Sequence, residues 1–513
     1  MSKTIIIGAG LAGLSAALQA AENGCNVKLV SSLPSERAQS VMAEGGINAA
    51  LNTKDENDSP EEHFTDTIKA ACGLADPNAV WGMTQAAPEL VHWLLKLGVK
   101  FNMSGYDDVD LRNFGGQKKK RTAFAQSDTG KQIMTAMIDA VRRKEASGMV
   151  ERFSHHSFLT LRLCGNICCG CVIRDEYSQE TVELPGDAVI VATGGMHGLF
   201  GNTTGSLSNT GEVTAELFRL GVPLANGEMI QYHPTTVKCG GKRMLISEAA
   251  RGEGGRLFAM KDGKQWYFME EKYPELGNLM PRDITAREIW KVSHESEVFL
   301  DMTEISEEII SNKLSGLADD CMTYLHKDIR KEPVSVLPGI HYFMGGILVD
   351  EQHRTPIQNL YAAGECCAQY HGANRLGGNS LLGALYGGRV AAKSACEQAD
   401  VVELSCATQI DVPPASQISE IKQLNKVMQE TMGVVRNENT LLNGIQTVQA
   451  LTGNLPLLGM AVLKSALARK ESRGAHWRED YPKSNDDDYL KTTVARFDGK
   501  QIQISFVPVP ERR

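Results

Sequence analysis

The segment TIIIGAGLAGLSAALQAAENGCNVKLVSS, at 4–32, restricts the fold of this chain more than any other. A run of β-prone residues leads directly into Gly8-x-Gly10-x-x-Gly13, and an apolar stripe at helical spacing and a second β-prone run follow. This order is typical of a strand, helix and strand that bind a dinucleotide pyrophosphate at the amino end of the helix, where backbone amides and the helix dipole favour an anion. The pattern predicts an α/β dinucleotide-binding domain.

The second strand of this unit ends in two serines. An acidic residue that binds a ribose is usual at this point, but Ser31 and Ser32 take its place. A hydroxyl group can still hydrogen-bond to a ribose, so the prediction of a dinucleotide site stands.

Two later segments extend the predicted sheet. DAVIVATGG, at 187–195, and NLYAAGE, at 359–365, are short apolar strands that lead into glycine. Strands so far apart predict one sheet assembled from distant parts of the chain, with an inserted domain at about 228–344. After about residue 403 the apolar spacing is helical, and a strand-like run, KQIQISFVPV, follows at 500–509.

Composition narrows the classes of function. The 513 residues are 42% hydrophobic and 22% charged, which is typical of a globular protein with several domains. A net charge of -9 argues against nucleic-acid binding, and we expect the basic run at 118–121, KKKR, to be a solvated turn. A strand that begins at Lys3 leaves no room for a leader peptide, and no apolar run approaches the about 18 residues of a membrane span. We therefore expect a soluble, cytoplasmic protein.

The twelve cysteines are irregularly spaced, which favours reduced thiols over a disulfide framework. Four of them, Cys164, Cys168, Cys169 and Cys171, lie close together and invite a metal or iron-sulfur interpretation. Their flanks alternate as in a β-hairpin, and the spacing lacks paired C-x-x-C motifs. We therefore predict no metal site.

Basic and hydrogen-bonding residues cluster beside glycines in and after the insertion. They are His233, Ser247, Arg251, Arg282, His341 and Arg375. A guanidinium group pairs with a carboxylate through two parallel hydrogen bonds. If these side chains converge on one pocket, they suit a substrate with two carboxylates.

Seven motifs make a family resemblance specific. In chain order they are QYHPTT at 231–236, SEAARGEGG at 247–255, MPRD at 280–283, HYFMGG at 341–346, AAGE at 362–365, HGANRLGGNSLL at 371–382 and ALARKESRGAHWRED at 466–480. Together they resemble the flavoprotein subunit of fumarate reductase and succinate dehydrogenase, from Lys3 to about Tyr481. L-Aspartate oxidase is a near relative of that family.

The resemblance implies an α/β fold with three domains. They are a Rossmann-like FAD-binding domain at 1–227 plus 345–402, an inserted α+β capping domain at 228–344, and a C-terminal helical domain and tail at 403–513. The cofactor residues that it implies are Gly8, Gly10, Leu11, Ala12, Gly13, Ser31, Ser40, Gly45, Gly46, Glu212, Glu365, Ser380 and Leu381.

The resemblance also implies the chemistry. Hydride transfer from flavin N5 would reduce fumarate to succinate, and Arg282 would donate the proton. Arg251 and Glu248 would relay protons to Arg282. The residues implied to hold the dicarboxylate are His233, Ser247, His341 and Arg375.

Three positions depart from the family pattern. Ser247 replaces a threonine and keeps the hydroxyl, and Glu212 replaces an aspartate and keeps the carboxylate. Gln39 occupies the position of the histidine that binds the flavin covalently in membrane-bound relatives. Glutamine has no nucleophilic ring nitrogen, so we expect non-covalent FAD. A flavin without that bond is the stronger reductant, which favours fumarate reduction over succinate oxidation.

Alternative functions stay open at this point. L-Aspartate oxidase has a glutamate that receives the substrate ammonium, and here Phe114 occupies that position, where an apolar ring cannot pair with an amine. A reductase of another enoate and a non-enzymatic electron-transfer subunit are the other candidates, although an electron carrier would not need a dicarboxylate site.

The resemblance implies partners as well. The chain has no iron-sulfur motif, so an iron-sulfur subunit is the expected electron donor, and that subunit could associate the chain indirectly with a membrane. The charged stretch KESRGAHWRED, at 470–480, is the expected contact surface.

Overall fold

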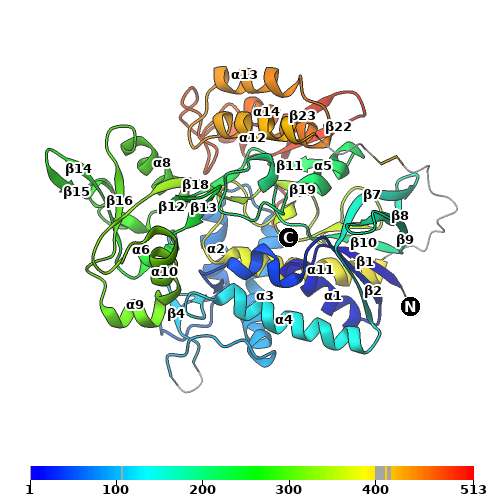
Figure 1. Cartoon of the computed structure of the whole chain (residues 1–513), viewed down its shortest axis with the longest axis horizontal. Coiled ribbons are helices and arrows are strands. Elements are labelled where there is room, and N and C mark those ends of the chain that lie inside the picture. The colour runs from blue at the N-terminus through cyan, green and yellow to red at the C-terminus, as the bar shows by residue number, and fades with distance from the viewer. Residues whose placement is uncertain (1, 106–107, 399–410, 413–416) are drawn as a thin grey trace.

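The computed structural model describes residues 2–105, 108–398, 411–412 and 417–513. The chain is arranged as a nucleotide-binding region (2–227 and 345–398), a capping region (228–344) and a C-terminal region (417–513). Figure 1 shows the capping region in green on the left, the N-terminal part of the nucleotide-binding region in blue and cyan, and the orange helices of the C-terminal region at the top. The predicted boundary between residues 402 and 403 lies outside the described residues.

A five-stranded parallel sheet forms the centre of the nucleotide-binding region. Its strands, in spatial order, are β20 (Leu360–Ala362), β10 (Ala188–Val191), β1 (Lys3–Ile7), β2 (Asn26–Ser31) and β6 (Val150–Ser154). All neighbouring strands pair in parallel. The prediction that distant glycine-terminated strands join one sheet is therefore confirmed.

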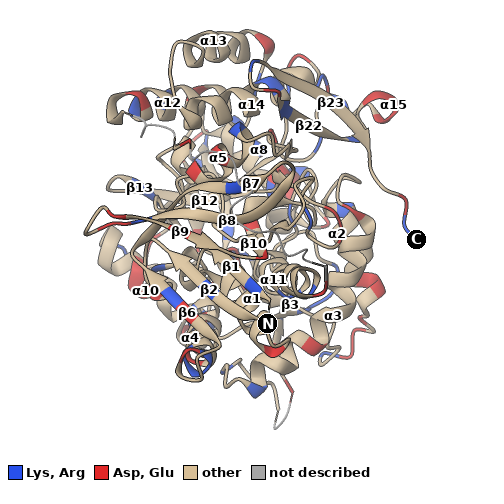
Figure 2. Ribbon diagram, turned by 90° about the vertical axis from the view of Figure 1, so that its right-hand side faces the viewer, with Lys and Arg blue, Asp and Glu red and all other residues tan. Residues whose placement is uncertain are grey.

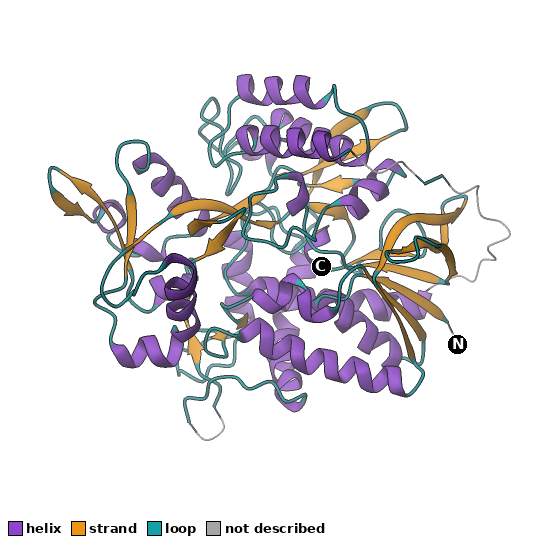
Figure 3. Cartoon of the chain, viewed as in Figure 1, coloured by secondary structure: helices purple, strands orange, loops and turns teal. Residues whose placement is uncertain are grey.

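Both faces of this sheet are covered, as the apolar runs of its strands β1, β10 and β20 require. Ile6 packs into a helical core on one face, whereas its neighbours Ile5 and Ile7 pack on the other face against a small antiparallel sheet. In Figure 3 the purple helices of the first layer run beside the orange parallel strands. The helices of the nucleotide-binding region are α1 (Leu11–Glu22), α2 (Pro60–Ala70), α3 (Pro77–Lys96), α4 (Thr129–Ala146), α5 (Glu212–Arg219) and α11 (Asn379–Gln398).

Two smaller sheets complete the nucleotide-binding region. The sheet that covers the parallel strands contains β7 (His156–Cys164), β8 (Ile167–Asp175) and β9 (Thr181–Pro185). The other contains β3 (Ile47–Asn48), β4 (Leu111–Arg112) and β5 (Thr122–Ala123).

The four clustered cysteines lie on the β7–β8 hairpin, as their alternating flanks predicted. Burial of Cys168 raises the pKa of its thiol to about 12. Among the described residues, no group of three or more His, Cys, Asp or Glu side chains is placed to hold a metal ion. The structure pairs Cys25 with Cys396 on α11 as a disulfide, which differs from the expected reduced state of all the thiols. Local spacing could not reveal this contact, because 371 positions separate the two residues.

The basic run at 118–121 is only partly solvated. Lys118 and Lys120 are exposed, but Arg121 is fully buried and pairs with Asp58 at 2.8 Å and Asp66 at 3.0 Å. The expectation of a solvated turn is therefore wrong for Arg121, because two buried carboxylates neutralise it. Figure 2 shows basic and acidic residues interspersed on the side of the molecule that it presents.

Two antiparallel sheets and several short helices form the capping region. The first sheet contains β13 (Lys242–Leu245), β12 (Ile230–Cys239) and β18 (Leu337–Phe343), and the second contains β15 (Lys264–Trp266), β14 (Arg256–Lys261), β16 (Val298–Asp301) and β17 (Val334–Ser335). The helices are α6 (Glu248–Gly252), α7 (Phe268–Lys272), α8 (Arg282–Val292), α9 (Glu307–Lys313) and α10 (Ser315–Asp320).

The two chain segments that border the capping region lie side by side. Leu224 pairs with Ile347 and Ala225 with Gly346. A Cβ atom on Gly345 would lie 1.9 Å from the Asn226 carbonyl oxygen, so only glycine permits this approach. The sheet that holds both segments contains β21 (Cys367–Ala368), β19 (Gly346–Leu348), β11 (Leu224–Ala225), β22 (Lys491–Phe497) and β23 (Ile502–Pro508).

The C-terminal region is therefore not wholly helical, because β22 and β23 add a hairpin to that sheet. Its helices are α12 (Ile418–Thr431), α13 (Glu438–Val448), α14 (Asn454–Ala468) and α15 (Asp486–Tyr489). The longer helices bury apolar side chains against α5, β11 and β18 in one shared core. No helix among the described residues is long and apolar enough to cross a bilayer.

Half of the six formal charges of the stretch 470–480 are buried, so the expected contact surface is wrong for them. Arg473, His476 and Arg478 are buried, whereas Lys470 and Glu479 are exposed. These buried groups hydrogen-bond within the C-terminal region, and Arg473 also donates to the Cys72 carbonyl of the nucleotide-binding region at 3.2 Å.

Arg469 is the centre of this buried network. Its Nε donates to Glu228 at 2.7 Å, its Nη1 to Glu471 at 2.7 Å and its Nη2 to Thr493 at 2.7 Å. The side chains of Arg469, Glu228 and Glu471 have no exposed surface. Because Glu228 lies two residues before β12, the network ties the start of the capping region to the C-terminal hairpin.

We predict that Arg469→Met lowers stability by about 3–5 kcal/mol, because it leaves Glu228 buried without its cation and removes one of the two arginines that pair with Glu471. Thermal unfolding followed by circular dichroism should show a transition several degrees lower. Arg496→Met, at an exposed position on β22, is the matched control and should leave the transition unchanged. Equal transitions for the two variants would contradict a stabilising role for the network.

Candidate functional site

A cavity of about 890 Å³ lies between the nucleotide-binding region and the capping region. The starts of α1 and α11 and the ends of β1 and β2 line one side, and residues of α6, α8 and β18 line the other. Twelve of the thirteen predicted cofactor residues line this cavity: Gly8, Gly10, Leu11, Ala12, Ser31, Ser40, Gly45, Gly46, Glu212, Glu365, Ser380 and Leu381.

Glycine is required at two positions after β1 for different structural reasons. Gly8 has a φ of +111°, and a Cβ atom there would lie 2.2 Å from the Ala192 carbonyl oxygen. A Cβ atom on Gly13 would lie 1.8 Å from the Gly8 carbonyl oxygen. Gly13, the one predicted cofactor residue outside the lining, therefore lets α1 pack closely on β1, as the third glycine of such a fingerprint does.

The cavity wall fits a flavin dinucleotide. The hydroxyl oxygen of Ser31 is buried at the end of β2 and has no hydrogen-bond partner among the described residues, as expected of a group that awaits a ribose hydroxyl. The helices α1 and α11 both begin at the cavity, where their first amides favour phosphate. Gln39 lies in the short turn η2 (Gln39–Met42), next to Ser40, whose Oγ accepts from the Leu11 amide at 3.3 Å.

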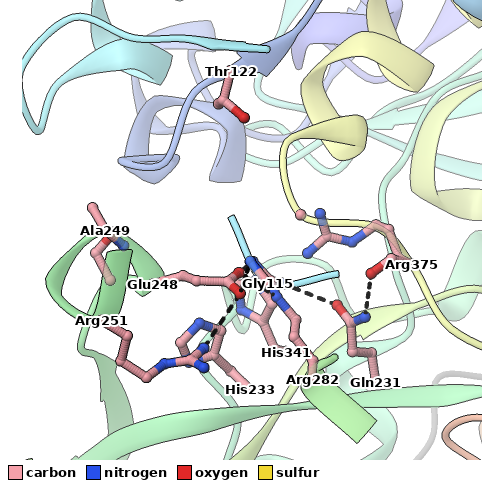
Figure 4. Close-up of polar contacts among 12 residues, drawn as sticks. Gly115, Thr122, Gln231, His233, Glu248, Ala249, Arg251, Arg282, His341 and Arg375 are labelled. Carbon is pink, nitrogen blue, oxygen red and sulfur yellow. Dashed lines mark hydrogen bonds and ion pairs between the residues drawn. The ribbon is translucent and has the colours of Figure 1, made fainter. Parts of the chain in front are cut away.

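On the capping side, one carboxylate lies between two arginines. Arg282, the first residue of α8, donates from Nε and Nη2 to Glu248 Oε2 at 2.8 and 2.6 Å. Arg251 pairs with Glu248 Oε1 at 3.4 Å, and the Gly115 amide donates to the same oxygen at 2.9 Å. Burial raises the pKa of Glu248, but Arg282 and Arg251 more than offset this effect and hold it below its usual value. Figure 4 shows Glu248 between the two guanidinium groups.

Gln231 joins this group to the nucleotide-binding region, a link that sequence reasoning did not assign. Its Oε1 accepts from Arg282 Nη1 at 3.1 Å, and its Nε2 donates to the Arg375 carbonyl at 2.8 Å and to Asn374 Oδ1 at 2.9 Å (Figure 4). Asn374 in turn donates to Asp283, the residue after Arg282, at 3.0 Å. Two buried amides therefore fix the first turn of α8 against the loop that carries Arg375.

Arg375 brings a second buried guanidinium group to the cavity. Burial, followed by the charge of Arg282, lowers the pKa of Arg375 to about 9. Its Nε has no hydrogen-bond partner among the described residues, and its guanidinium carbon lies 4.4 Å from the centre of the Tyr342 ring. A buried cation with an unused donor fits an anionic ligand.

Two histidines face each other near the arginines. The ring centres of His233 and His341 are 5.1 Å apart (Figure 4). Burial, followed by the charge of Arg282, holds the pKa of both imidazoles well below the usual value, so both are neutral near pH 7. Ser247 also lines the cavity and caps α6. The structure thus brings together the four predicted substrate residues, whereas Arg251 lies behind Glu248 and outside the cavity lining.

Phe114 lies in the wall between the cofactor side and the arginines. It is 2% exposed, and a Cβ atom on Gly45 would lie 3.0 Å from its ring. The next residue, Gly115, provides the amide that holds Glu248. The side of the cavity that Phe114 forms is therefore apolar.

Comparison with known proteins agrees with this architecture. A family profile described as "FAD binding domain" matches residues 3–381, and one described as "Fumarate reductase flavoprotein C-term" matches residues 451–512. The succinate dehydrogenase flavoprotein subunit of Bacillus subtilis is 38% identical, and the alignment covers 100% of this chain and 98% of that protein. The 8-methylmenaquinol:fumarate reductase flavoprotein subunit of Wolinella succinogenes is 32% identical, with 99% and 92% covered.

Solved structures show the same fold along the whole chain. A mutant of the E. coli quinol fumarate reductase FrdA superposes with a TM-score of 0.90 at 28% identity, and the match covers 99% of this chain and 96% of that one. Sdh1 of Mycobacterium smegmatis gives a TM-score of 0.83 at 29% identity, with 100% and 95% covered. The chain therefore belongs to the succinate dehydrogenase and fumarate reductase flavoprotein family of FAD-dependent oxidoreductases that act on CH–CH groups.

Proposed function

We propose that this flavoprotein reduces fumarate to succinate. The observation that carries the proposal is the pair of buried arginines, Arg282 and Arg375, at the cavity between the cofactor residues and the cap. A guanidinium group binds a carboxylate through two parallel hydrogen bonds, and burial strengthens that attraction. Arg375 would hold one carboxylate of the substrate, while His233, Ser247 and His341 would bind the other.

Arg282 is the proposed proton donor. When bound, the reduced flavin supplies a hydride to one alkene carbon, and the other carbon then needs a proton. An arginine with a usual pKa of about 12.5 or higher is a weak acid, but the carbanion that develops beside a carboxylate is basic enough to take its proton. The charge of Arg282 also stabilises the negative charge that builds up before the proton moves.

Glu248 and Arg251 are placed to replace that proton. Glu248 is ionised at rest, so it keeps Arg282 protonated through two hydrogen bonds. After Arg282 has given up its proton, Glu248 can pass on a proton that arrives by way of Arg251, which lies 3.4 Å from the other carboxylate oxygen. Each turnover takes one proton from this relay, which returns Arg282 to its charged state.

Phe114 favours fumarate over L-aspartate as the substrate. Its ring is buried in the cavity wall, where an ammonium group would lose its hydration without gaining a carboxylate partner. L-Aspartate oxidation is the second candidate, and reduction of another enoate that fits the same arginines is the third. A flavoprotein that only transfers electrons would not need buried cations at the cavity.

We propose an iron-sulfur polypeptide as the electron donor, as the succinate dehydrogenase and fumarate reductase relatives suggest. Attachment to a membrane would then occur through partner chains, and the chain itself would lie in the cytoplasm at the inner face of the membrane. Affinity purification of the native protein tests this part of the proposal, because an iron-sulfur polypeptide should be recovered with it.

Substrate turnover by the purified protein distinguishes the candidate activities. Under anaerobic conditions, we expect fumarate to oxidise reduced viologen dye and to yield one succinate for every two electrons. L-Aspartate with oxygen should give no oxaloacetate. Oxaloacetate without succinate would identify an aspartate oxidase, and the absence of both products would contradict a fumarate reductase.

We predict that Arg282→Gln lowers kcat for fumarate reduction at least about a hundredfold, because it removes both proton donation and charge stabilisation. Bound FAD, measured by absorbance, should stay at the wild-type level. Arg282→Lys should fail as well, since lysine lacks the planar guanidinium head. The matched control is Arg287→Gln on the same helix, where the arginine stacks on Trp477 outside the cavity, and it should retain activity. Turnover close to wild type in Arg282→Gln would refute the assignment.

Gln39 generates a prediction about the cofactor. FAD is held non-covalently, because a glutamine amide cannot form the bond to the flavin ring that a histidine forms. Acid denaturation should release all flavin into the supernatant, whereas flavin left in the precipitated protein would refute the prediction. A covalent histidyl bond raises the flavin potential, and each 30 mV in a two-electron couple corresponds to about 1.4 kcal/mol. We therefore expect fumarate reduction to be faster than succinate oxidation with an artificial acceptor.

A further inference from the structure

Thr204 lies in the cavity wall at a point where the nucleotide-binding region meets the cap. Its backbone amide donates to the Ile340 carbonyl on β18 at 3.0 Å, and the Arg243 amide on β13 donates to the Thr203 carbonyl at 3.2 Å. These two bonds attach the loop to both strands of the cap that flank β12. The Thr204 side chain is thereby held next to the residue that follows Ile340, which is His341.

The Thr204 hydroxyl has two possible acceptors. Its Oγ1 is 2.8 Å from His341 Nδ1 and 3.3 Å from the Ile340 carbonyl oxygen. That carbonyl already accepts the Thr204 amide, whereas Nδ1 of His341 has no other hydrogen-bond partner among the described residues. If Nδ1 carried the ring proton instead, it would donate to Thr204 Oγ1, and the hydroxyl proton would go to the Ile340 carbonyl, a longer contact of 3.3 Å to an oxygen that already accepts an amide. The hydroxyl proton is therefore better used on Nδ1, at 2.8 Å.

This choice determines what His341 offers to the cavity. Burial, followed by the charges of Arg282, Arg375 and His197, holds the pKa of His341 well below its usual value, so the ring carries one proton. If Nδ1 accepts from Thr204, that proton is on Nε2. In this tautomer Nε2 is a hydrogen-bond donor, which a carboxylate requires.

His233, the other histidine of the predicted substrate site, has no comparable constraint. Nδ1 of His233 lies 3.0 Å from the Thr235 carbonyl oxygen, an acceptor, and 3.3 Å from the Thr235 amide, a donor. Both tautomers of His233 therefore have a partner.

We propose that Thr204 is a positioning residue that fixes His341 with its proton on Nε2 and so makes it a donor to one substrate carboxylate. The inference rests on the proposed dicarboxylate substrate. It identifies a residue outside the family motifs quoted above that acts on the substrate only through His341.

The test compares Thr204→Val, which keeps the branched shape and removes the hydroxyl, with Thr204→Ser, which keeps the hydroxyl. Succinate is titrated into the oxidised holoenzyme and its Kd is measured from the flavin absorbance change. We expect Thr204→Val to weaken binding about tenfold and Thr204→Ser to stay within about twofold of wild type. Equal affinities for wild type and Thr204→Val would overturn the proposal.

A second measurement separates this role from a general disturbance of the loop. In a His341→Gln background, Thr204→Val should change the Kd no further, because the residue through which it acts is absent. A full additional loss in that background would refute the role through His341. Nitrogen-15 NMR of histidine-labelled protein, with His341 assigned from its loss in His341→Gln, should show protonated Nε2 in wild type and a shift toward protonated Nδ1 in Thr204→Val.

Failure of the proposed function is distinguishable from failure of this inference. If the wild-type holoenzyme binds neither succinate nor fumarate, the dicarboxylate assignment is wrong before any variant is compared. If it binds them and Thr204→Val binds equally well, the substrate assignment stands and only the role of Thr204 is lost.

Discussion

The buried carboxylate of Glu248 makes the rest of the site possible. Arg282, Arg251 and Arg375 are three guanidinium groups removed from water, and Glu248 is the carboxylate that contacts two of them. Without it their mutual repulsion and desolvation would be uncompensated. With it the four side chains still carry an excess of two positive charges, which the two carboxylates of fumarate would neutralise. Charge balance therefore links the stability of the site to the kind of ligand that it accepts.

The fold places these charges by bringing together residues that are distant in sequence. The cap contributes Glu248 and Arg282 from the first turns of α6 and α8, and the loop before α11 contributes Arg375. Gln231 and Asn374 fix the distance between the two sides: Gln231 accepts from Arg282, Asn374 donates to Asp283, and the two amides hydrogen-bond to each other. Positioning of this kind matters because a displacement of about 1 Å can cost a hundredfold in rate.

The parallel sheet and most of the cavity lining could be predicted from sequence, because glycine-terminated strands and local motifs mark them. Which side chains pair with one another in the folded chain could not be predicted. Arg469 meets Glu228 across 241 positions, and no local pattern in the sequence indicates that pair. Gln231 was visible inside a motif, but an amide shows no role until its acceptors and donors are known. Local patterns predict elements, whereas burial of charge depends on contacts that only the folded chain creates.

The pairing of β11 with β19 limits the directions in which the capping region can move. Both covalent connections to the capping region pass through one narrow point, where Gly345 lies against Asn226 and β22 pairs with β11 along its other edge. Two separate tethers would let a lid slide or twist in several directions. Two adjacent and hydrogen-bonded tethers instead restrict the capping region to rotation about one hinge axis. Rotation about that axis would carry Glu248, Arg282 and His341 away from the cofactor residues together, so the proposed proton donor, its proposed relay and one proposed carboxylate-binding residue would move as one unit.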